Sequence, residues 1–382
     1  MASVVNSSEN TAVQAVTSPQ DQAAFLDTPA RVYQGNDCWV PPLRSSEACL
    51  FKEDNEFLKY GSFQAFVATQ NRAPVGRIVA AINRRLIEKE KRPIGVFGYF
   101  ECIDDISVAE ALFNAALTWL KQRGILLVRG PIDLSTHNRC LFLVNRFDSP
   151  PMIMMPYNPP HYPEFMTQLG WQKAIDAYSY LLDDSADLPP QYERGYKIAL
   201  KSGVKFRPLH TEGDAFWQDV NSMYHLFTKM FADNWGATAR TLEEFVAEAK
   251  DLRSLVDPDI FWVAEYQEEM IGFFMTLPDY NIPLKHVNGR LNLLGKLKFL
   301  WYRRFIDQAR VLVICALPEH RRRMVPLGLI HLGFTHGRQK RRNSYRRAEL
   351  GYVYENNGPS RSIVEATGAK IYKTYRIYEK AI

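Results

Sequence analysis

The stretch from residue 311 to residue 324, Val-Leu-Val-Ile-Cys-Ala-Leu-Pro-Glu-His-Arg-Arg-Arg-Met, decides the fold of this chain. The apolar run 311–317 predicts a buried strand, because a run of this length that ends at a proline suits a strand better than a helix. The residues that follow predict a helix over 323–337 and a further strand over 347–353. The order strand, helix, strand indicates an α/β fold with a basic turn between the first strand and its helix.

The segments on either side of this stretch extend the pattern along the whole chain. In the second half, strands are expected at 204–208, 260–266, 270–277 and 370–378, and helices at 214–233, 242–255 and 359–367. In the first half, strands are expected at 62–70, 74–84, 95–103, 125–130 and 177–182, and helices at 22–34, 107–123 and 161–169. The two halves share their order of elements, which indicates a duplication of the fold, although no residue-level repeat is visible.

The length of 382 residues fits two domains rather than one core. Residues 1–22 are rich in small polar residues and lack the basic start and apolar core of a secretory signal, so we expect a disordered tail there. A turn-rich break at 184–190 and a basic amphipathic segment at 191–201 predict a linker over 184–203. The predicted domains are therefore 23–183 and 204–382.

Composition restricts the class of protein further. No apolar run approaches the roughly 20 residues of a membrane span, so no transmembrane helix is expected. Five cysteines without C-x-x-C spacing indicate a reducing cytoplasm and no metal site. The net charge of +5 is mildly basic and favours a partner that carries phosphate groups.

Two segments of the second half resemble a known superfamily. Leu317-Pro-Glu-His-Arg-Arg-Arg-Met324 is similar to the GNAT motif R-x-x-G-x-[GA], and Arg347-Ala-Glu-Leu-Gly-Tyr-Val-Tyr-Glu-Asn-Asn357 resembles the later GNAT strand and its Asn-rich helix start. The resemblance implies two tandem GNAT-like domains, each a mixed, mostly antiparallel twisted sheet flanked by helices. It also implies an acyltransferase.

The chain from about residue 25 to its end also resembles a bacterial group of tandem GNAT-like proteins related to bacterial ceramide synthases, which N-acylate a long-chain amine. The segments that carry this resemblance are Asn36-Asp-Cys-Trp-Val-Pro-Pro-Leu43, Gly98-Tyr-Phe-Glu-Cys102, Arg129-Gly-Pro-Ile-Asp133, Phe147-Asp-Ser-Pro-Pro-Met-Ile-Met-Met-Pro156 and Tyr372-Lys-Thr-Tyr-Arg-Ile-Tyr-Glu-Lys380. It implies an acyl thioester donor, acyl-CoA or acetyl-CoA or an acyl carrier protein, and an amine acceptor, with a long-chain lipid amine as one candidate.

The donor site is expected at the turn after residue 317. A helix start and guanidinium groups bind pyrophosphate, so Arg321, Arg322 and Arg323 are candidate donor-binding residues, together with Asn356. Met324 and Pro326 stand where the motif has glycines, which leaves open that the arginines form a solvated loop on a degenerate domain. The equivalent turn of the first half, 104–108, is acidic and lacks arginine, so the second half is the better donor site.

Three residues are candidates for the chemistry. Acylation requires a neutral amine, and Glu101, which follows an aromatic run, is the first candidate for its general base. His137 in a polar loop is the second, and Tyr157 is a candidate acid for the leaving thiolate. The alternatives are a structural glutamate, a solvated loop histidine and a packed tyrosine whose hydroxyl is already bonded.

Two further segments leave alternatives open. The run 149–160 is rich in Pro and Met and indicates either the wall of an acyl or amine tunnel or a buried strand with rigid ends. The segment 296–305 mixes Lys and Arg with Leu, Trp and Phe, which favours either peripheral contact with the anionic inner face of the membrane or an ordinary amphipathic helix. A nucleic-acid patch there is a weaker third possibility, and no recognised nucleic-acid motif is visible elsewhere, so no specific nucleic-acid partner is expected.

The alternative to an N-acyltransferase is an inactive protein of the same fold that binds an acyl thioester or a lipid.

Overall fold

The computed structural model describes residues 11–183, 187–340 and 344–382. The strands of the first half are β1 (Ala12–Ala15), β2 (Gly61–Gln70), β3 (Ala73–Asn83), β4 (Ile94–Cys102), β5 (Leu127–Gly130), β6 (Phe142–Leu143) and β7 (Gln172–Asp183). Its helices are α1 (Pro19–Val32), α2 (Arg44–Ala48), α3 (Arg84–Glu90), α4 (Ile106–Lys121) and α5 (His161–Gln168).

The second half contains the strands β8 (Lys205–Pro208), β9 (Trp262–Tyr266), β10 (Glu269–Pro278), β11 (Gln308–Ala316), β12 (Arg347–Tyr354) and β13 (Lys370–Ala381). Its helices are α6 (Gln191–Lys201), α7 (Gly213–Phe231), α8 (Leu242–Leu252), α9 (Asn281–Val287), α10 (Leu293–Tyr302), α11 (Val325–Gln339) and α12 (Gly358–Glu365). The α/β fold predicted from the sequence is confirmed, and each predicted strand and helix lies within a few residues of its expected place. The helices α2, α3 and α9 were not predicted.

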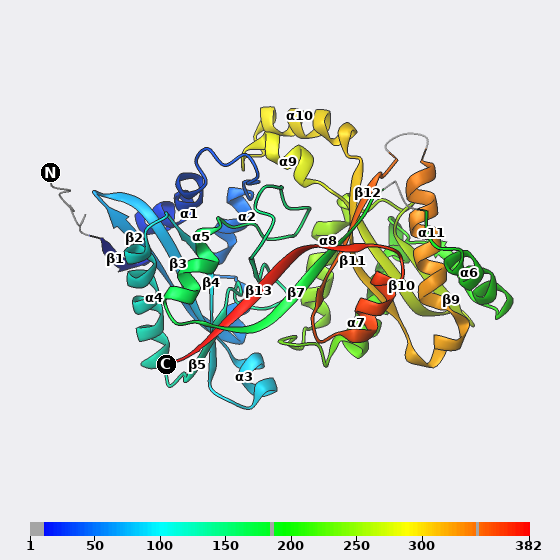
Figure 1. Cartoon of the computed structure of the whole chain (residues 1–382), viewed down its shortest axis with the longest axis horizontal. Helices are drawn as coiled ribbons and strands as arrows, with labels where there is room; N and C mark the ends of the chain where they lie inside the picture. Colours follow the sequence, from blue (N-terminus) through cyan, green and yellow to red (C-terminus); the bar gives the residue numbers. More distant parts are fainter. Residues whose placement is uncertain (1–10, 184–186, 341–343) are drawn as a thin grey trace.

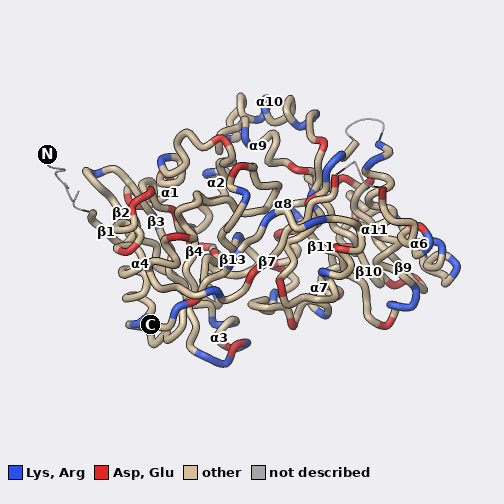
Figure 2. Tube along the Cα trace, viewed as in Figure 1, with Lys and Arg blue, Asp and Glu red and all other residues tan. Residues whose placement is uncertain are grey.

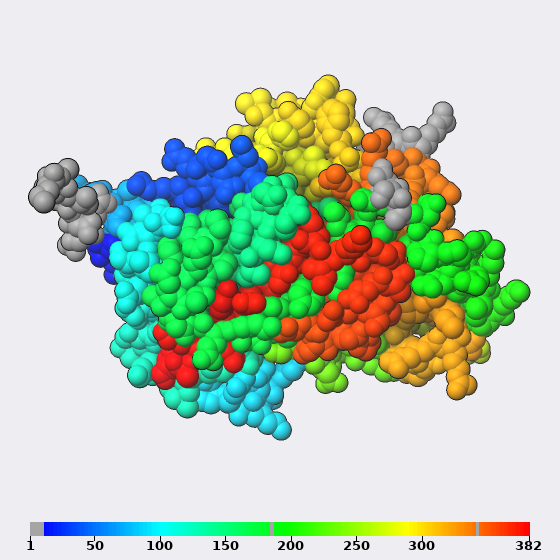
Figure 3. Space-filling view, viewed as in Figure 1, coloured from blue at the N-terminus to red at the C-terminus, as the bar shows by residue number. Residues whose placement is uncertain are grey.

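The strands form one continuous sheet, with the order β1-β2-β3-β4-β5-β13-β7-β12-β11-β10-β9-β8 and with β6 beside β13. Figure 1 shows β7 and β13 side by side through the middle of the molecule, between the two halves. The C-terminal strand also lies across the face of the molecule that Figure 3 shows. The two halves therefore share one sheet.

The final strands of the two halves are exchanged. β7, from the first half, pairs antiparallel with β12 of the second half, and β13, from the second half, pairs antiparallel with β5 of the first half. Each half thus completes its sheet with a strand from the other, and the backbone hydrogen bonds of both strands hold the halves together. The domain boundary predicted at 184–203 stays a prediction. The predicted C-terminal domain, 204–382, includes β13, which lies next to strands of the first half.

The prediction of a disordered tail over 1–22 is wrong for residues 11–22, which the structure describes. Residues 12–15 form β1, which pairs with β2 in the register Ala12↔Thr69 to Ala15↔Phe66. Ser18 caps α1 and forms a capping box with Asp21, with a proline at the first helical turn. This Ser-Pro-x-Asp pattern is a helix-start signal that was present in the sequence. Residues 1–10 of the predicted tail, like residues 184–186 of the predicted linker, lie outside the described residues.

Each half contains one parallel pair of strands, and these two pairs position the site. β4 pairs with β5 from Ile94↔Leu127 to Val96↔Arg129, and β11 pairs with β12 from Gln308↔Arg347 to Val311↔Leu350. Beyond these registers each pair stops hydrogen bonding, and both β4 and β11 contain a register shift against the preceding strand. Such irregularities bend a strand away from its neighbour, and they leave an opening next to each central strand.

Candidate active site

A large cavity occupies the opening between β11 and β12. Its volume is about 1440 Å³, and its sheet wall includes residues 311–314 of β11 and 350–354 of β12. This volume exceeds the range of roughly 300–1,000 Å³ that is typical of small-molecule pockets. The cavity is therefore large enough for a ligand with a long arm or a long chain.

The helices α7 and α8 form the apolar wall of this cavity. The residues of α7 and α8 on this wall are Phe216, Val220, Met223, Tyr224, Phe227, Thr228, Met230, Phe231, Phe245, Glu248, Ala249 and Leu252. Most of these side chains are aliphatic or aromatic, and such a surface favours an apolar chain over a charged one. The arrangement therefore suits an acyl or alkyl chain that lies between the sheet and α7.

The three arginines at the turn before α11 have different environments. Arg321 and Arg322 are both exposed, but of the two only Arg321 lines the large cavity. Arg323 donates a hydrogen bond to the Ser202 carbonyl, and its guanidinium carbon lies 3.8 Å from the centre of the Tyr266 ring. The structure thus brings Arg321 to the cavity and holds Arg323 against the neighbouring helix and strand instead.

Met324, which stands where the motif has a glycine, has a left-handed backbone conformation. Its φ is 56° and its ψ is 29°, which is the left-handed region, and it caps α11 without a side-chain hydrogen bond. This region costs a non-glycine residue about 1–2 kcal/mol, a cost that a glycine at this position would avoid. Pro326 lines the cavity and has no N–H, which removes one backbone donor from the helix start.

Asn356, the predicted donor-binding asparagine, is exposed at the turn after β12. Its neighbour Asn357 lines the cavity and caps α12 by accepting a hydrogen bond from the Ser360 N–H. Of the two neighbours, it is Asn357 and not the predicted Asn356 that lines the cavity. An Asn directly before Gly-Pro is a helix-cap signal that could have distinguished the two.

The corresponding opening in the first half is closed. The Ile132 N–H donates to the Phe97 carbonyl at 2.7 Å, and the Tyr99 N–H donates to Asp133 Oδ1 at 2.6 Å. Gly98 permits this approach, because a Cβ at that position would lie 2.4 Å from the Ile132 carbonyl oxygen. Aromatic rings fill the space behind it, with the Phe142 ring next to both Phe97 and Phe100.

A smaller cavity of about 180 Å³ remains beside this closed opening, and Glu101 lines it. Glu101 is 7% exposed, and its Oε2 accepts a hydrogen bond from the Tyr162 hydroxyl at 2.9 Å. Burial raises the pKa of Glu101, against the opposing effect of Arg77 and Arg139. A buried carboxyl with a raised pKa is a common feature of general bases.

Glu101 belongs to a buried network of charges. Arg77, which is fully buried, lies 3.8 Å from Glu101 Oε1 and 2.9 Å from Glu47 Oε2. Arg139 lies 2.9 Å from Asp133 and 3.5 Å from Glu47. The network thus holds three carboxylates against two guanidinium groups.

The pKa values within this network follow from burial and pairing. Burial raises the pKa of Asp133. Burial also acts to raise the pKa of Glu47, but Arg139 and Arg77 outweigh it and lower that pKa overall. Since the network has one more carboxylate than guanidinium, it can take up either a proton or an external cation.

His137 lines the large cavity, and its Nε2 lies 2.8 Å from the Thr238 carbonyl oxygen. Burial lowers the pKa of His137. The neutral ring therefore donates from Nε2 to this carbonyl, which leaves Nδ1 as an acceptor. The prediction of a solvated loop histidine is wrong, because the loop folds against residues 236–238 of the second half.

Tyr157 lines the small cavity with Glu101. Its hydroxyl donates to the Phe147 carbonyl at 2.9 Å, and the Asn36 amide donates to it at 3.2 Å. The proton that an acid must give up is thus already shared with a backbone carbonyl. This geometry favours the alternative of a packed tyrosine with a bonded hydroxyl.

The two cavities adjoin each other. Tyr99, Asp133, Arg139 and Cys140 line both of them, and so do residues 154–156. The structure thus places Glu101 and Tyr157 in the small cavity and both His137 and Arg321 in the large one. Sequence analysis missed Arg77, Arg139, Asp133 and Tyr162, which surround Glu101 but come from separate strands and loops.

The Pro- and Met-rich run 149–160 contains no strand, so the alternative of a buried strand is wrong. Met154 and Met155 line both cavities. Within the described residues, no group of three or more His, Cys, Asp or Glu side chains is arranged to hold a metal ion.

Comparison with known proteins places this site in a family. No protein-family model matches the chain. The chain is 31% identical over 375 residues to the bacterial ceramide synthase of Caulobacter vibrioides, which covers 96% of each chain. It is 29% identical over 380 residues to Protein YghO of Escherichia coli, with 97% of this chain and 95% of that protein covered.

Solved structures agree on the fold. A tandem GNAT protein from the clavulanic acid biosynthesis pathway superposes with a TM-score of 0.59 at 12% identity, over 97% of this chain and 98% of that one. A GCN5-related N-acetyltransferase from Sphaerobacter thermophilus gives a TM-score of 0.52 at 12% identity, over 97% and 95%. The tandem GNAT architecture predicted from the sequence is thereby confirmed. With 31% identity over 96% of both chains, this chain belongs to the family of the bacterial ceramide synthase of Caulobacter vibrioides, an acyltransferase family with a tandem GNAT fold.

Proposed function

We propose that this protein is an N-acyltransferase that moves an acyl group from an acyl-CoA or acyl carrier protein thioester to the amino group of a long-chain lipid amine. One observation carries this proposal: the large apolar cavity of the second half adjoins the small cavity that contains the buried Glu101. A donor arm and an acceptor amine can therefore meet at the region that both cavities share. The named acceptor class also draws on the name of the relative from Caulobacter vibrioides.

The donor is assigned to the opening between β11 and β12. Arg321 is placed to bind the phosphate groups at the turn before α11, and Asn357 marks the opposite wall at the start of α12. The apolar wall of α7 and α8 takes the acyl chain. Because Pro326 removes a backbone donor, phosphate binding relies more on the Arg321 guanidinium than on the helix start.

The acceptor is assigned to the small cavity. The surrounding network has three carboxylates and two guanidinium groups, so the ammonium form of an amine balances its charge. Glu101, whose pKa is raised by burial, then removes a proton from this ammonium, directly or through water. The freed amine attacks the thioester carbonyl carbon, so that the C–N bond forms, the C–S bond breaks and the electron pair leaves on sulfur. The nitrogen then loses its second proton to solvent, which leaves the neutral amide.

His137 is the second candidate for the base. Its Nδ1 is an acceptor in the large cavity, whereas its Nε2–H is held by Thr238. The thiolate formed in the reaction is stable as such or takes a proton from solvent, so the step needs no dedicated acid. Tyr157 is accordingly assigned to the wall of the acceptor cavity.

Release of free thiol tests this proposal. The purified chain is mixed with an acyl-CoA series and a long-chain amine, and the thiol is measured with and without the amine. Amine-dependent thiol release, with the amide detected by mass spectrometry, is the expected result.

The alternative is an inactive protein that binds an acyl thioester. It predicts thermal stabilisation by acyl-CoA, because a ligand that binds the folded state raises its stability, but no thiol release with any amine. That outcome, obtained over the whole acyl series and with acylated carrier protein, would contradict the proposal.

A further inference from the structure

The helix α10 exposes apolar side chains where a soluble surface would carry polar ones. Leu293 is 77% exposed, Leu294 69%, Leu297 57%, Leu300 61% and Trp301 55%. Large exposed apolar patches mark interaction sites in folded proteins. Figure 1 shows α10 at the edge of the molecule, above α9 and away from the shared sheet.

These apolar residues lie on one face of the helix. At 100° per residue, positions 293, 294, 297, 300 and 301 fall within an arc of roughly 120°. The opposite face is fixed to the protein, because Gly295 is buried and the Phe299 ring stacks on Tyr280 at 5.9 Å. The amphipathic pattern is thus inverted: the apolar stripe of α10 points away from the core.

Basic residues surround the apolar stripe. Lys296 and Lys298 flank it on its two sides, and Arg303 and Arg304 follow it. The sequence from 280 to 306 contains no Asp or Glu. Figure 2 shows Lys and Arg along α10 without acidic residues among them. An exposed stripe of Leu and Trp between lysines is the pattern of a helix that lies in the interface of an anionic bilayer.

We infer that α10 docks the protein on the surface of an anionic lipid bilayer, with Leu293, Leu297 and Trp301 among the acyl chains and the lysines at the headgroups. The charge favours this partner over a second copy of the chain, since two copies would bring their basic residues together. No helix within the described residues is long and apolar enough to cross a membrane, so the contact is peripheral. The inference rests on exposure and charge and does not depend on the proposed acyl transfer.

The position of α10 also relates the bilayer to the acceptor cavity. The His286 and Tyr302 rings stack between α9 and α10 at 3.5 Å between centroids. On α9, Asn281 and Leu284 line the small cavity that contains Glu101. The Gly289 carbonyl between the two helices accepts from the Arg44 N–H, which ties this corner to the segment at 39–42 that lines the same cavity. Docking through α10 therefore brings the acceptor cavity next to the lipid surface.

Vesicle flotation with the full chain tests this inference. Vesicles of phosphatidylcholine alone are compared with vesicles that also contain phosphatidylglycerol. The wild type is expected to float with the anionic vesicles and to be released by added salt. The double variant Leu297→Ser with Trp301→Ser is expected to partition at least about tenfold less. Lys296→Glu with Lys298→Glu is expected to lose the preference for anionic lipid.

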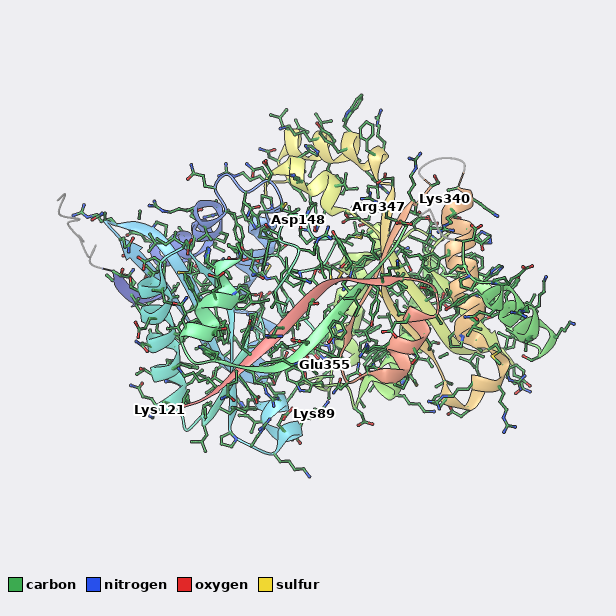
Figure 4. The ribbon with its side chains drawn as sticks, viewed as in Figure 1. Lys89, Lys121, Asp148, Lys340, Arg347 and Glu355 are labelled. Carbon is green, nitrogen blue, oxygen red and sulfur yellow. The ribbon has the colours of Figure 1, made fainter. Side chains whose placement is uncertain are left out.

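Matched controls lie at the other end of the molecule. Leu126 is 61% exposed, and Lys121 ends α4, far from α10 in Figure 4. Leu126→Ser and Lys121→Glu are expected to float like the wild type. Because the α10 side chains are exposed, the variants should keep the thermal unfolding midpoint of the wild type, which is measured alongside.

Wild type that fails to bind anionic vesicles at low salt would overturn the inference, as would α10 variants that bind equally well. The inference would also be overturned if the wild type forms an oligomer, does not bind vesicles, and becomes monomeric in the double variant Leu297→Ser with Trp301→Ser. That result would assign the stripe to a protein contact.

Discussion

The two openings beside the central strands of the sheet have the same origin and different contents. In the first half, the loop after β5 closes the gap, with the Asp133 carboxylate on the Tyr99 N–H and aromatic rings behind it. In the second half, the gap between β11 and β12 remains hollow and forms a cavity of about 1440 Å³. Under the proposed function, the duplicated fold divides its work: one half keeps room for the donor, and the other uses its closed opening to bury the carboxyl group assigned to the acceptor.

The exchanged strands explain why both halves can contribute to one site. β7 and β13 lie between the two openings and hold them in a fixed relation. Side-chain contacts also join the two halves. Lys89 Nζ on α3 donates to the carbonyls of Ala232, Asn234 and Ala237. The following predictions test this division between a donor half and an acceptor half.

The largest effect is expected from Glu101→Gln in the acceptor half. It should lower kcat/KM by a factor of about 10²–10⁴, the usual contribution of a general base. Stability should not fall. Burial raises the folded-state pKa of Glu101, so the stability it contributes is present at low pH and lost as the pH rises through that pKa. The ionised group is therefore unfavourable at neutral pH, and Gln can still accept from Tyr162.

The pH profile and a matched control sharpen this prediction. In the wild type, kcat/KM should rise with pH through the raised pKa of Glu101, and this limb should be absent in Glu101→Gln. Glu110→Gln, on the exposed side of α4, should leave rate and profile unchanged. A Glu101→Gln variant that unfolds at a clearly lower temperature, or that keeps its rate, would assign Glu101 a structural role.

The next effect concerns the donor half and separates three neighbouring arginines. Arg321→Gln should raise KM for acyl-CoA by about tenfold, because a charge-assisted hydrogen bond to phosphate is lost. Arg322→Gln, at a side chain that does not line the cavity, should change KM little. Arg323→Gln should lower the thermal unfolding midpoint rather than raise KM, since Arg323 contacts Ser202 and Tyr266. Equal changes in KM for all three would indicate a diffuse basic surface instead of a donor site at Arg321.

A smaller effect is expected from His137→Gln, at a residue that lines the large cavity. Gln can still donate to the Thr238 carbonyl, so kcat/KM should fall by less than about tenfold. Steady-state rates for this variant and for Glu101→Gln, measured side by side, rank the two candidates. A loss of about 10² or more for His137→Gln would transfer the role of general base from Glu101 to His137.

The smallest effect is expected from Met324→Gly at the turn before α11. The left-handed backbone of Met324 costs about 1–2 kcal/mol, and glycine relieves this cost but adds about 0.5–1 kcal/mol of unfolded-state entropy. The net gain should raise Tm by about 1–3 °C in a thermal scan. Gly351→Ala is the opposite case, because its Cβ would lie 2.9 Å from the Tyr178 carbonyl oxygen, and it should lower Tm. A fall in Tm for Met324→Gly would show that the turn is not strained.

The elements of this fold could be predicted because local patterns specify them. The apolar run 311–317 and the periodic helix that follows it need no tertiary information. The exchange of β7 and β13 could not be predicted, since both sequences only indicate a final strand and do not identify its neighbour. The chain start was also misjudged, because its composition outweighed the capping signal at Ser18 and Asp21.

The candidate site was predictable in part for the same reason. Glu101 and Arg321 lie next to recognisable strands, and the sequence could place them at the ends of those strands. Arg77 and Arg139, which set the charge around Glu101, lie on another strand and on a loop, and neither carries a local signal. Only the folded chain brings both of them within 4 Å of the same carboxylate, Glu47.

A crystal structure of the protein soaked with a non-hydrolysable acyl-CoA analogue tests the division between the halves most directly. The account predicts that the pantetheine arm lies between β11 and β12, with its phosphate groups at Arg321 and its acyl chain against α7. An analogue bound beside β4 and β5, or bound away from both openings, would contradict it.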